Sequence, residues 1–111
     1  MSRGSHLGEF EQLVLLAVLR LGEGAYGMTV RRELEETARR KVTLGSVYAT
    51  LDRLEQKGLL TSWHTEPDPD RGGHPRRYFE VSPEGRLALS RTQGMMERMW
   101  AGVELDVEGT P

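Results

Sequence analysis

The sequence predicts a mostly α-helical fold with one small β hairpin, arranged as a winged helix-turn-helix domain followed by a C-terminal helix. Three observations lead to this prediction. Apolar residues recur at helical spacing in four segments, one segment has two unlike faces, and two β-prone runs lie between the third and fourth segments. Three helices, a hairpin and a further helix in this order are typical of a winged helix. We expect the domain over residues 8–82, the C-terminal helix over 83–103, and disorder at 1–7 and 104–111.

The composition is that of a small globular protein. The chain has 111 residues, of which 37% are hydrophobic and 29% charged, enough for one domain but not for two full cores. It contains no cysteine, which excludes disulfides and thiolate metal sites and fits a reducing cytosol. No apolar run approaches the roughly 18 residues that a membrane helix needs, and the start lacks the apolar core of a signal peptide. We therefore expect a cytoplasmic protein without a membrane segment.

The net charge of −2 does not by itself indicate a nucleic-acid binder, but the charges are unevenly distributed. Residues 20–78 hold 11 basic against 9 acidic residues, whereas residues 79–111 hold 3 against 6. Phosphate contact needs only a few well-placed cations. The mildly basic middle of the chain is therefore compatible with a modest, salt-sensitive affinity for DNA.

The first predicted helix, over residues 9–21, is apolar on more than one side. Leu15, Leu16 and Leu19 lie away from the main apolar face. A helix that is apolar nearly all round is buried on several sides, and a chain of this length has little material to cover it twice. We infer that a second subunit covers it; the alternative is a helix central to a single core. The main face carries Phe10, Leu13, Val14, Ala17, Val18 and Leu21.

The helix predicted between a Thr43 cap and Gly58 has two different faces. One face carries Val47, Leu51 and Leu54 toward a core. A face kept small and hydroxyl-bearing allows close approach of a bulky polar partner, and the DNA major groove accepts such a helix. The alternative is an ordinary amphipathic helix with a modest surface. The opposite stripe consists of Ser46, Ala49, Thr50 and Arg53.

The hairpin is predicted from two β-prone runs, residues 59–65 and 76–81, separated by a turn-rich loop with three prolines and two glycines. Arg71 in the loop and Arg76 and Arg77 at its base are suited to phosphate contact, because guanidinium groups bind phosphates bidentately. An arginine in a loop is otherwise simply solvated. Three arginines beside a small-faced helix favour contact with DNA.

The last predicted helix begins at a Ser82 cap, with Pro83 in the first turn and Glu84 near the positive end of the helix dipole. It continues to about residue 101. Its long stripe of small, methionine and tryptophan residues indicates a packed face. That stripe consists of Ala88, Thr92, Met95, Met96, Met99, Trp100 and Val103.

Two blocks of the chain resemble the signature of PadR-type transcriptional regulators, in the compact subgroup with a single C-terminal helix. The blocks are residues 45–59 (GSVYATLDRLEQKGL) and residues 72–85 (GGHPRRYFEVSPEG). The segment AYG at 25–27, before VRREL at 30–34, fits as well, so the resemblance covers about residues 8–100. It implies a homodimeric bacterial repressor that acts on a palindromic operator, with the C-terminal helix packed on the partner's first helix.

The resemblance also implies roles for individual residues. Tyr48 is expected to bond a phosphate through its hydroxyl, although a partly buried core tyrosine is the alternative. At His74 the family often has a basic residue, so the wing is expected to bind DNA less well above the histidine pKa of about 6.5. The complete set of expected DNA contacts is Thr43, Ser46, Tyr48, Ala49, Thr50, Arg53, Arg71, Arg76 and Arg77.

Some compact relatives hold planar aromatic ligands between their C-terminal helices at the dimer interface. Met96, Met99 and Trp100 are the candidates for such an effector site here, because their side chains are polarisable and adaptable. Dimer core is the alternative role for these residues. The expected dimer interface comprises Phe10, Leu15, Leu16, Leu19, Thr92, Met95, Met96, Met99 and Trp100.

Nothing in the sequence indicates an enzyme, a cofactor or a metal site. There is no glycine-rich phosphate loop after a strand, and His6, His64 and His74 lack metal-ligand spacing. The competing hypothesis is a winged-helix protein-interaction module that does not bind DNA. Such an adaptor would carry apolar residues on the outward face of the third helix.

Overall fold

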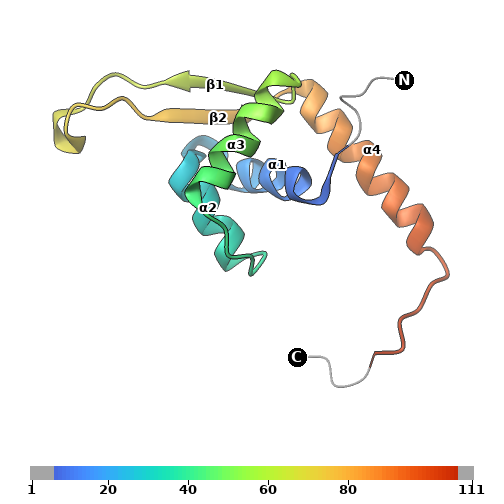
Figure 1. Ribbon diagram of the computed structural model, residues 1–111. Helices are drawn as coiled ribbons and strands as arrows, with labels where there is room; N and C mark the ends of the chain where they lie inside the picture. Colours follow the sequence, from blue (N-terminus) through green and yellow to red (C-terminus); the bar gives the residue numbers. More distant parts are fainter. Residues whose placement is uncertain (1–6, 108–111) are drawn as a thin grey trace.

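The computed structural model describes residues 7–107, with Arg71 described by its backbone only. Figure 1 shows a helical body of three helices, with a hairpin along one edge and a fourth helix that runs away from the body. The predicted mostly α fold with a two-stranded hairpin is confirmed. The helices are α1 (Glu9–Leu21), α2 (Gly27–Glu36), α3 (Leu44–Gln56) and α4 (Pro83–Trp100); the strands are β1 (Leu60–His64) and β2 (Arg77–Val81); short 3₁₀ turns η2 (Gly22–Gly24) and η3 (Pro69–Arg71) complete the chain.

Local hydrogen bonds fix the starts of α3 and α4 at the residues that the sequence indicates. The Ser46 amide donates to Oγ1 of Thr43 at 3.1 Å, and the Gly85 amide donates to Oγ of Ser82 at 3.0 Å. These caps satisfy amides that have no partner within the helix. Gly58 adopts φ +80° just after α3, a left-handed conformation that glycine accepts without a steric cost. The chain can therefore turn sharply from α3 into β1.

The core lies where α1, α3 and β2 meet, and it explains part of the apolar character of α1. Leu15 is 0% exposed within a single subunit, so its predicted place in the dimer interface is wrong. α1 contacts α2, α3 and β2, which cover it on several sides. Leu16, at 43% exposed, is the residue of α1 that still presents a large apolar side chain to solvent. Leu7, which we expected in a disordered segment, instead packs into this core.

The two halves of α4 differ in burial. Gly85, Ala88 and, at the middle of the helix, Thr92 are buried. Thr92 packs within its own subunit and its hydroxyl donates to the carbonyl of Ala88 at 2.9 Å, so its predicted interface role is also wrong. Beyond it, the large side chains of Met95, Met96, Met99 and Trp100 are all exposed.

The hairpin, which we call the wing together with its connecting residues 65–76, is tied to the start of α2. β1 and β2 pair antiparallel from Leu60 opposite Val81 to His64 opposite Arg77. The Phe79 amide donates to the carbonyl of Ala25 at 2.9 Å, which adds the segment before α2 to the edge of the sheet. No helix among residues 7–107 is long and apolar enough to cross a membrane.

A close approach between α4 and β1 makes Gly85 the most sensitive position in α4. A Cβ at Gly85 would lie 2.2 Å from the carbonyl oxygen of Leu59 and 2.7 Å from Cγ1 of Val81. Gly85→Ala is therefore expected to lower the free energy of unfolding by about 1–3 kcal/mol, the usual cost of overpacking. Urea unfolding followed by circular dichroism measures this change.

Gly94→Ala in the same helix is the matched control. Its nearest neighbour would be the flexible end of Arg98 at 3.4 Å, so the helix gains about 0.5–1 kcal/mol from the better helix former. Equal stability of the two variants would show that α4 does not pack on Leu59 in this way.

Candidate nucleic-acid interface

The outward face of α3 has three of the four residues that the sequence predicts for it. Ser46, Ala49 and Arg53 are exposed at positions i, i+3 and i+7, so they form one stripe along the helix. Thr50 is only 3% exposed, and its predicted contact with DNA is wrong. It lies three residues after Val47 and four before Leu54, so it falls on the border between the two faces and turns inward. The exposed stripe is therefore narrower than the sequence indicates.

The two hydroxyl residues at the start of α3 bond to each other. The Ser46 hydroxyl donates to the carbonyl of Thr43 at 2.9 Å, and Oγ1 of Thr43 accepts the Ser46 amide. Both side chains are exposed. Each can still exchange a further hydrogen bond with a partner outside the protein, because a hydroxyl has one donor and two acceptor positions.

Tyr48 lies between α3 and the start of α2. It is half-buried, and a Cβ at Gly27 would come within 2.3 Å of its Cζ and 2.4 Å of its hydroxyl oxygen. Gly27 is thus the residue that lets the ring lie flat on the first turn of α2. The packed ring fits the alternative of a partly buried tyrosine, and the contact between its hydroxyl and a phosphate stays a prediction.

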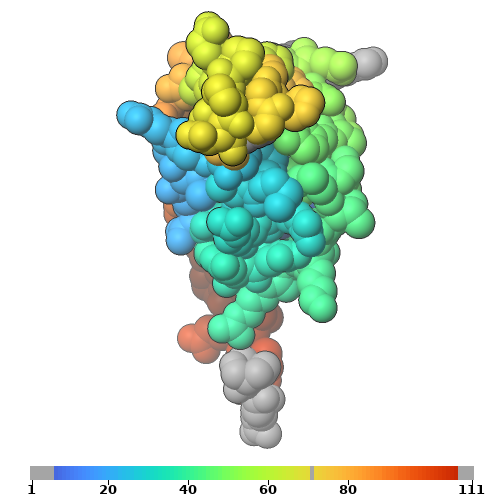
Figure 2. Space-filling model, turned by 90° about the vertical axis from the view of Figure 1, so that its left-hand side faces the viewer, coloured from blue at the N-terminus to red at the C-terminus, as the bar shows by residue number. Residues whose placement is uncertain are grey.

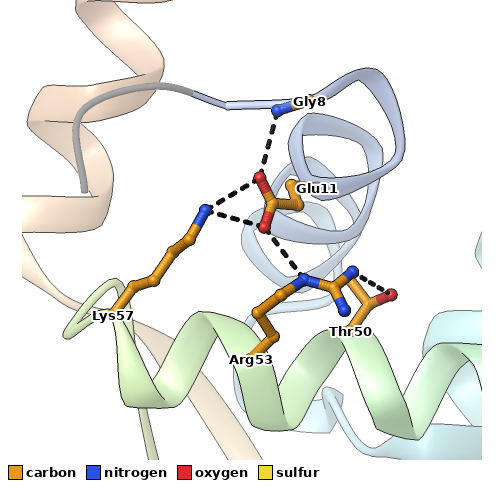
Figure 3. A network of polar contacts seen from close by, with 5 residues as sticks. All are labelled: Gly8, Glu11, Thr50, Arg53 and Lys57. Carbon is orange, nitrogen blue, oxygen red and sulfur yellow. Dashed lines mark hydrogen bonds and ion pairs between the residues drawn. The ribbon is translucent and has the colours of Figure 1, made fainter. Parts of the chain in front are cut away.

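A buried carboxylate holds the C-terminal part of α3 against the start of α1 (Figure 3). Oε2 of Glu11 accepts from Nε of Arg53 at 3.2 Å and from Nζ of Lys57 at 2.9 Å, while Oε1 accepts the Gly8 amide at 3.0 Å. Burial raises the pKa of Glu11, but hydrogen bonds from Lys57, the Gly8 amide and Arg53 outweigh it and hold the pKa below its usual value. Glu11 is therefore ionised at neutral pH and fixes two cations at one end of α3.

Arg53 is held without being covered. Its Nη2 also donates to Oγ1 of Thr50 at 3.2 Å, yet half of the side chain, 51%, remains exposed. These contacts occupy two of the five N–H donors of the guanidinium group. Arg53 thus presents an oriented guanidinium edge beside the stripe of Ser46 and Ala49.

Arg77 joins the wing to α3 and does not extend into solvent. Its Nη1 donates to Asp52 at 2.8 Å, its Nη2 to Glu55 at 2.6 Å, and its Nε to the Ser62 hydroxyl at 3.2 Å. Arg77 thus pairs with two carboxylates of α3, which the sequence did not indicate, and its contact with phosphate stays a prediction. The alternation of side chains along β2 could have predicted this inward position of Arg77. Residue 77 is two positions before the buried Phe79 and lies on the same face of the strand.

Arg76 occupies the base of the wing above a group of aromatic rings. Its guanidinium carbon lies 4.1 Å from the centre of the Tyr26 ring, and its Nη1 donates to the Tyr78 hydroxyl at 3.4 Å. Tyr78 in turn packs edge-on against Tyr26 and stacks on Trp63. Arg76 is half-exposed, and the contacts of its guanidinium group described here are with aromatic side chains. The side chain of Arg71 lies outside the described part of the chain.

The wing tip and α3 share one side of the molecule. Figure 2 shows the loop of the wing, in yellow, above α2 and next to the greens of α3. The wing loop and α3 are therefore accessible from the same side of the molecule. Within residues 7–107, no group of three histidine, aspartate or glutamate side chains is arranged to hold a metal ion.

Sequence reasoning missed the residues that position this surface. Glu11 and Lys57 are 46 residues apart, and Arg77 and Asp52 are 25 apart, so no local pattern connects them. The sequence did contain one indication that Glu11 faces the core. It precedes Val14, Leu15 and Val18 by three, four and seven residues, which places an acid on the core-facing side of an apolar helix.

Comparisons with known proteins agree with the fold and with the sequence blocks. Residues 15–91 match the profile of the family described as "Transcriptional regulator PadR-like family". The transcriptional regulator Rv3488 of Mycobacterium tuberculosis is 35% identical over 74 residues, which are 67% of this chain and 64% of that relative. This chain thus spans slightly less than two thirds of the relative's length.

Two solved structures show the same architecture. A PadR-like transcription factor from Bacteroides fragilis is 26% identical, with 81% of this chain and 82% of that chain covered and a TM-score of 0.67. A PadR family transcriptional regulator from Eggerthella lenta is 27% identical, with 85% and 81% covered and a TM-score of 0.66. Both structures are covered over most of their length.

The ion pairs of Glu11 predict a pH-dependent contribution to stability. Glu11→Gln leaves Lys57 and Arg53 without their carboxylate and is expected to lower the free energy of unfolding by roughly 1–3 kcal/mol near neutral pH. Because the pKa of Glu11 is depressed by folding, this contribution is present above the pKa of the unfolded chain, about 4.3, and is lost as the pH falls through the folded value. Urea unfolding at several pH values measures the gap between the variant and the unsubstituted chain.

The matched control is Glu9→Gln, which removes an exposed carboxylate that pairs with Arg40 at 2.8 Å. Exposed pairs contribute little, so this variant should differ from the unsubstituted chain by less than about 1 kcal/mol. If the difference in stability between Glu11→Gln and the unsubstituted chain does not narrow as the pH falls below about 4, folding does not lower the pKa of Glu11.

Proposed function

Because the chain belongs to the transcriptional regulator PadR-like family, we propose that it represses transcription by binding a palindromic operator as a homodimer. The exposed stripe of Ser46, Ala49 and Arg53 carries this proposal. It is small enough to enter the major groove, which is about 12 Å wide, and it ends in an oriented arginine. The named relatives are regulators, which supports a non-catalytic role for this chain.

In the proposed complex, α3 lies in the major groove and reads base edges. Arg53 is the residue best suited to a guanine, whose O6 and N7 accept a bidentate guanidinium. Because Glu11 and Thr50 already hold it, Arg53 loses less conformational freedom on binding than a fully solvated arginine would. Ser46 supplies a hydroxyl group and Ala49 a methyl group to the proposed contact with the bases.

Contacts to the DNA backbone surround this stripe. The hydroxyls of Thr43 and Tyr48 lie at the first turns of α3 and α2, where amide dipoles also favour a phosphate. Arg76 extends the contact to the wing, and Arg71 remains a predicted contact at the tip. Arg77 acts as a positioning residue, because it holds the wing at a fixed place relative to α3.

The proposed homodimer is supported by the apolar surface that one copy leaves open. A groove of about 660 Å³ runs between α1 and α4, and Leu16, Leu19, Met96 and Trp100 contribute to its lining. Large apolar patches of this kind mark interaction sites. We propose that the partner's α4 lies here. Phe10, partly buried on the core, and Met95 and Met99, exposed on α4, remain predicted interface residues.

The same groove is our proposed place for a planar aromatic effector, enclosed between two copies. Met96 and Trp100 line it, whereas Met99 is not among the lining residues. The competing role as a protein-interaction module without DNA binding is not supported by the residues on the outward face of α3. An adaptor would need apolar side chains on the outward face of α3, and that face instead carries Ser46, Ala49 and Arg53.

Removing the arginine of the stripe tests the proposed DNA contact. Arg53→Ala is expected to weaken binding to an operator fragment about ten- to a hundredfold, because one bidentate contact to a base is lost. Fluorescence anisotropy with DNA that contains an inverted repeat measures the affinity. Arg91→Ala, an exposed arginine on α4, is the control for the loss of one positive charge. An equal loss in both variants would refute a specific role for Arg53.

Alanine substitutions of the two arginines at the base of the wing, Arg76 and Arg77, should affect different properties of the protein. Arg76→Ala is expected to leave stability nearly unchanged and to reduce the slope of log affinity against log salt by about one, because one phosphate contact is lost. Arg77→Ala should lower the melting temperature, since Asp52 and Glu55 are left without their shared cation. Affinity titrations at several salt concentrations and thermal unfolding separate these effects. Identical behaviour of the two variants would contradict the assignment.

A further inference from the structure

Three aromatic rings gather at the base of the wing, outside the core. Tyr26 comes directly before α2, Trp63 lies on β1 and Tyr78 lies on β2. Tyr26 and Tyr78 are half-buried, and Trp63 is 45% exposed. The core of residues 7–107, with the apolar side chains that pack on it, includes none of the three. Burial in the core therefore does not explain these rings, which we call the aromatic base.

The rings of the aromatic base hold one another in place. Tyr78 is the middle ring: it packs edge-on against Tyr26, with ring centres 5.4 Å apart, and it stacks on Trp63 at 6.2 Å. The backbone supports the same arrangement, because Trp63 pairs with Tyr78 in the hairpin and Tyr26 forms an isolated bridge with Tyr78. Three separate segments thus build one aromatic surface.

Arg76 is fixed on this surface at both of its ends. Its backbone amide donates to Oγ1 of Thr65 at 2.9 Å, and its carbonyl accepts the Thr65 amide at 2.9 Å. Its guanidinium carbon lies 4.1 Å from the centre of the Tyr26 ring, and its Nη1 donates to the Tyr78 hydroxyl at 3.4 Å. An arginine on a ring uses the face of its guanidinium group, while its five N–H donors lie in the plane of that group. Tyr78 therefore takes one N–H donor and Tyr26 takes none.

The aromatic base also links the wing to α3. Gly27 follows Tyr26 directly, and a Cβ at Gly27 would come within 2.3 Å of Cζ of Tyr48 on α3. The first turn of α2 therefore contacts the arginine of the wing through Tyr26 and the tyrosine of α3 through Gly27. Because the two contacts come from neighbouring residues, the place of Arg76 relative to α3 depends on the start of α2.

We propose that Tyr26 is a positioning residue for the contact between Arg76 and a DNA phosphate, with the Tyr78 hydroxyl as the second group that holds the guanidinium. This inference rests on the proposed function, in which Arg76 contacts the DNA backbone. A flexible side chain that must be ordered on binding lowers the affinity. Holding Arg76 in place beforehand should therefore raise the affinity about three- to tenfold.

A double-mutant cycle between Tyr26 and Arg76 tests this role. A phosphate contact is independent of sequence, so the probe is a fluorescent duplex of about 30 base pairs of mixed sequence, titrated at low salt and read by anisotropy. Tyr26→Leu should weaken binding about three- to tenfold in the unsubstituted chain and have no further effect in Arg76→Ala. An equal loss in the two backgrounds overturns the proposal, because the ring would then act through the fold and not through Arg76.

Two controls separate positioning from effects on folding or net charge. Tyr26→Phe keeps the ring and should bind as tightly as the unsubstituted chain; an affinity as low as that of Tyr26→Leu overturns the proposal. Arg91→Ala removes an exposed arginine of α4, and Tyr26→Leu should keep its full effect in that background. Loss of the effect there as well would assign it to net charge and also overturn the proposal.

Tyr78→Phe tests the second group with a smaller change to the protein. It keeps the ring that packs between Tyr26 and Trp63 and removes only the hydroxyl that accepts from Arg76. The variant should weaken binding about two- to threefold, and only when Arg76 is present. An equal loss in Arg76→Ala overturns the role of the Tyr78 hydroxyl.

The outcomes distinguish this inference from the proposed function. An unsubstituted chain that does not bind the duplex at low salt overturns both. A chain that binds the duplex, with a loss from Tyr26→Leu that is equal with and without Arg76, overturns the positioning role alone and leaves DNA binding intact.

Discussion

The arrangement of the surface that we propose for DNA binding depends on one buried carboxylate. Glu11 sits on the core side of α1, where an isolated charge would be costly, and it is stabilised because Lys57, Arg53 and the Gly8 amide converge on it. The same contacts fix the angle at which α3 crosses α1 and leave the guanidinium of Arg53 oriented but accessible. A hydrophobic residue at this position would satisfy the core equally well, so the acid is explained by the cations it positions.

A second set of ion pairs holds the other side of α3. Arg77 bridges from β2 to Asp52 and Glu55, so α3 is held by α1 through one ion-pair cluster and by the wing through another. Rigid placement of α3 matters for recognition. Duplex DNA is stiff, so a protein surface that needs no rearrangement loses less affinity to the cost of ordering its side chains and loops. The exposed stripe on α3 and the aromatic rings under Arg76 are thus held in place before any partner binds, whereas the apolar groove between α1 and α4 is where we propose the second copy.

The sequence predicts local features well and distant contacts poorly. The caps at Thr43 and Ser82 and the turn at Gly58 mark element boundaries because their causes lie within a few residues. The predicted exposure of Thr50 and Leu15 was wrong, because helical periodicity gives the direction of a side chain around the helix axis but not which neighbouring element covers that side chain. The ion pairs of Arg77 were not predicted, because its partners Glu55 and Asp52 lie 22 and 25 residues away in the sequence. The fold class was therefore accessible from the sequence, whereas the contacts that hold the exposed face of α3 in place were not.

The central claim is that α3 presents Ser46, Ala49 and Arg53 to the major groove. Methylation of operator DNA by dimethyl sulfate tests it most directly, because the reagent attacks guanine N7 in the major groove and adenine N3 in the minor groove. Our account predicts protection of guanine N7 in two half-sites about one helical turn apart, with the protection lost in Arg53→Ala. Bound DNA in which guanine N7 stays fully reactive while adenine N3 is protected would contradict it.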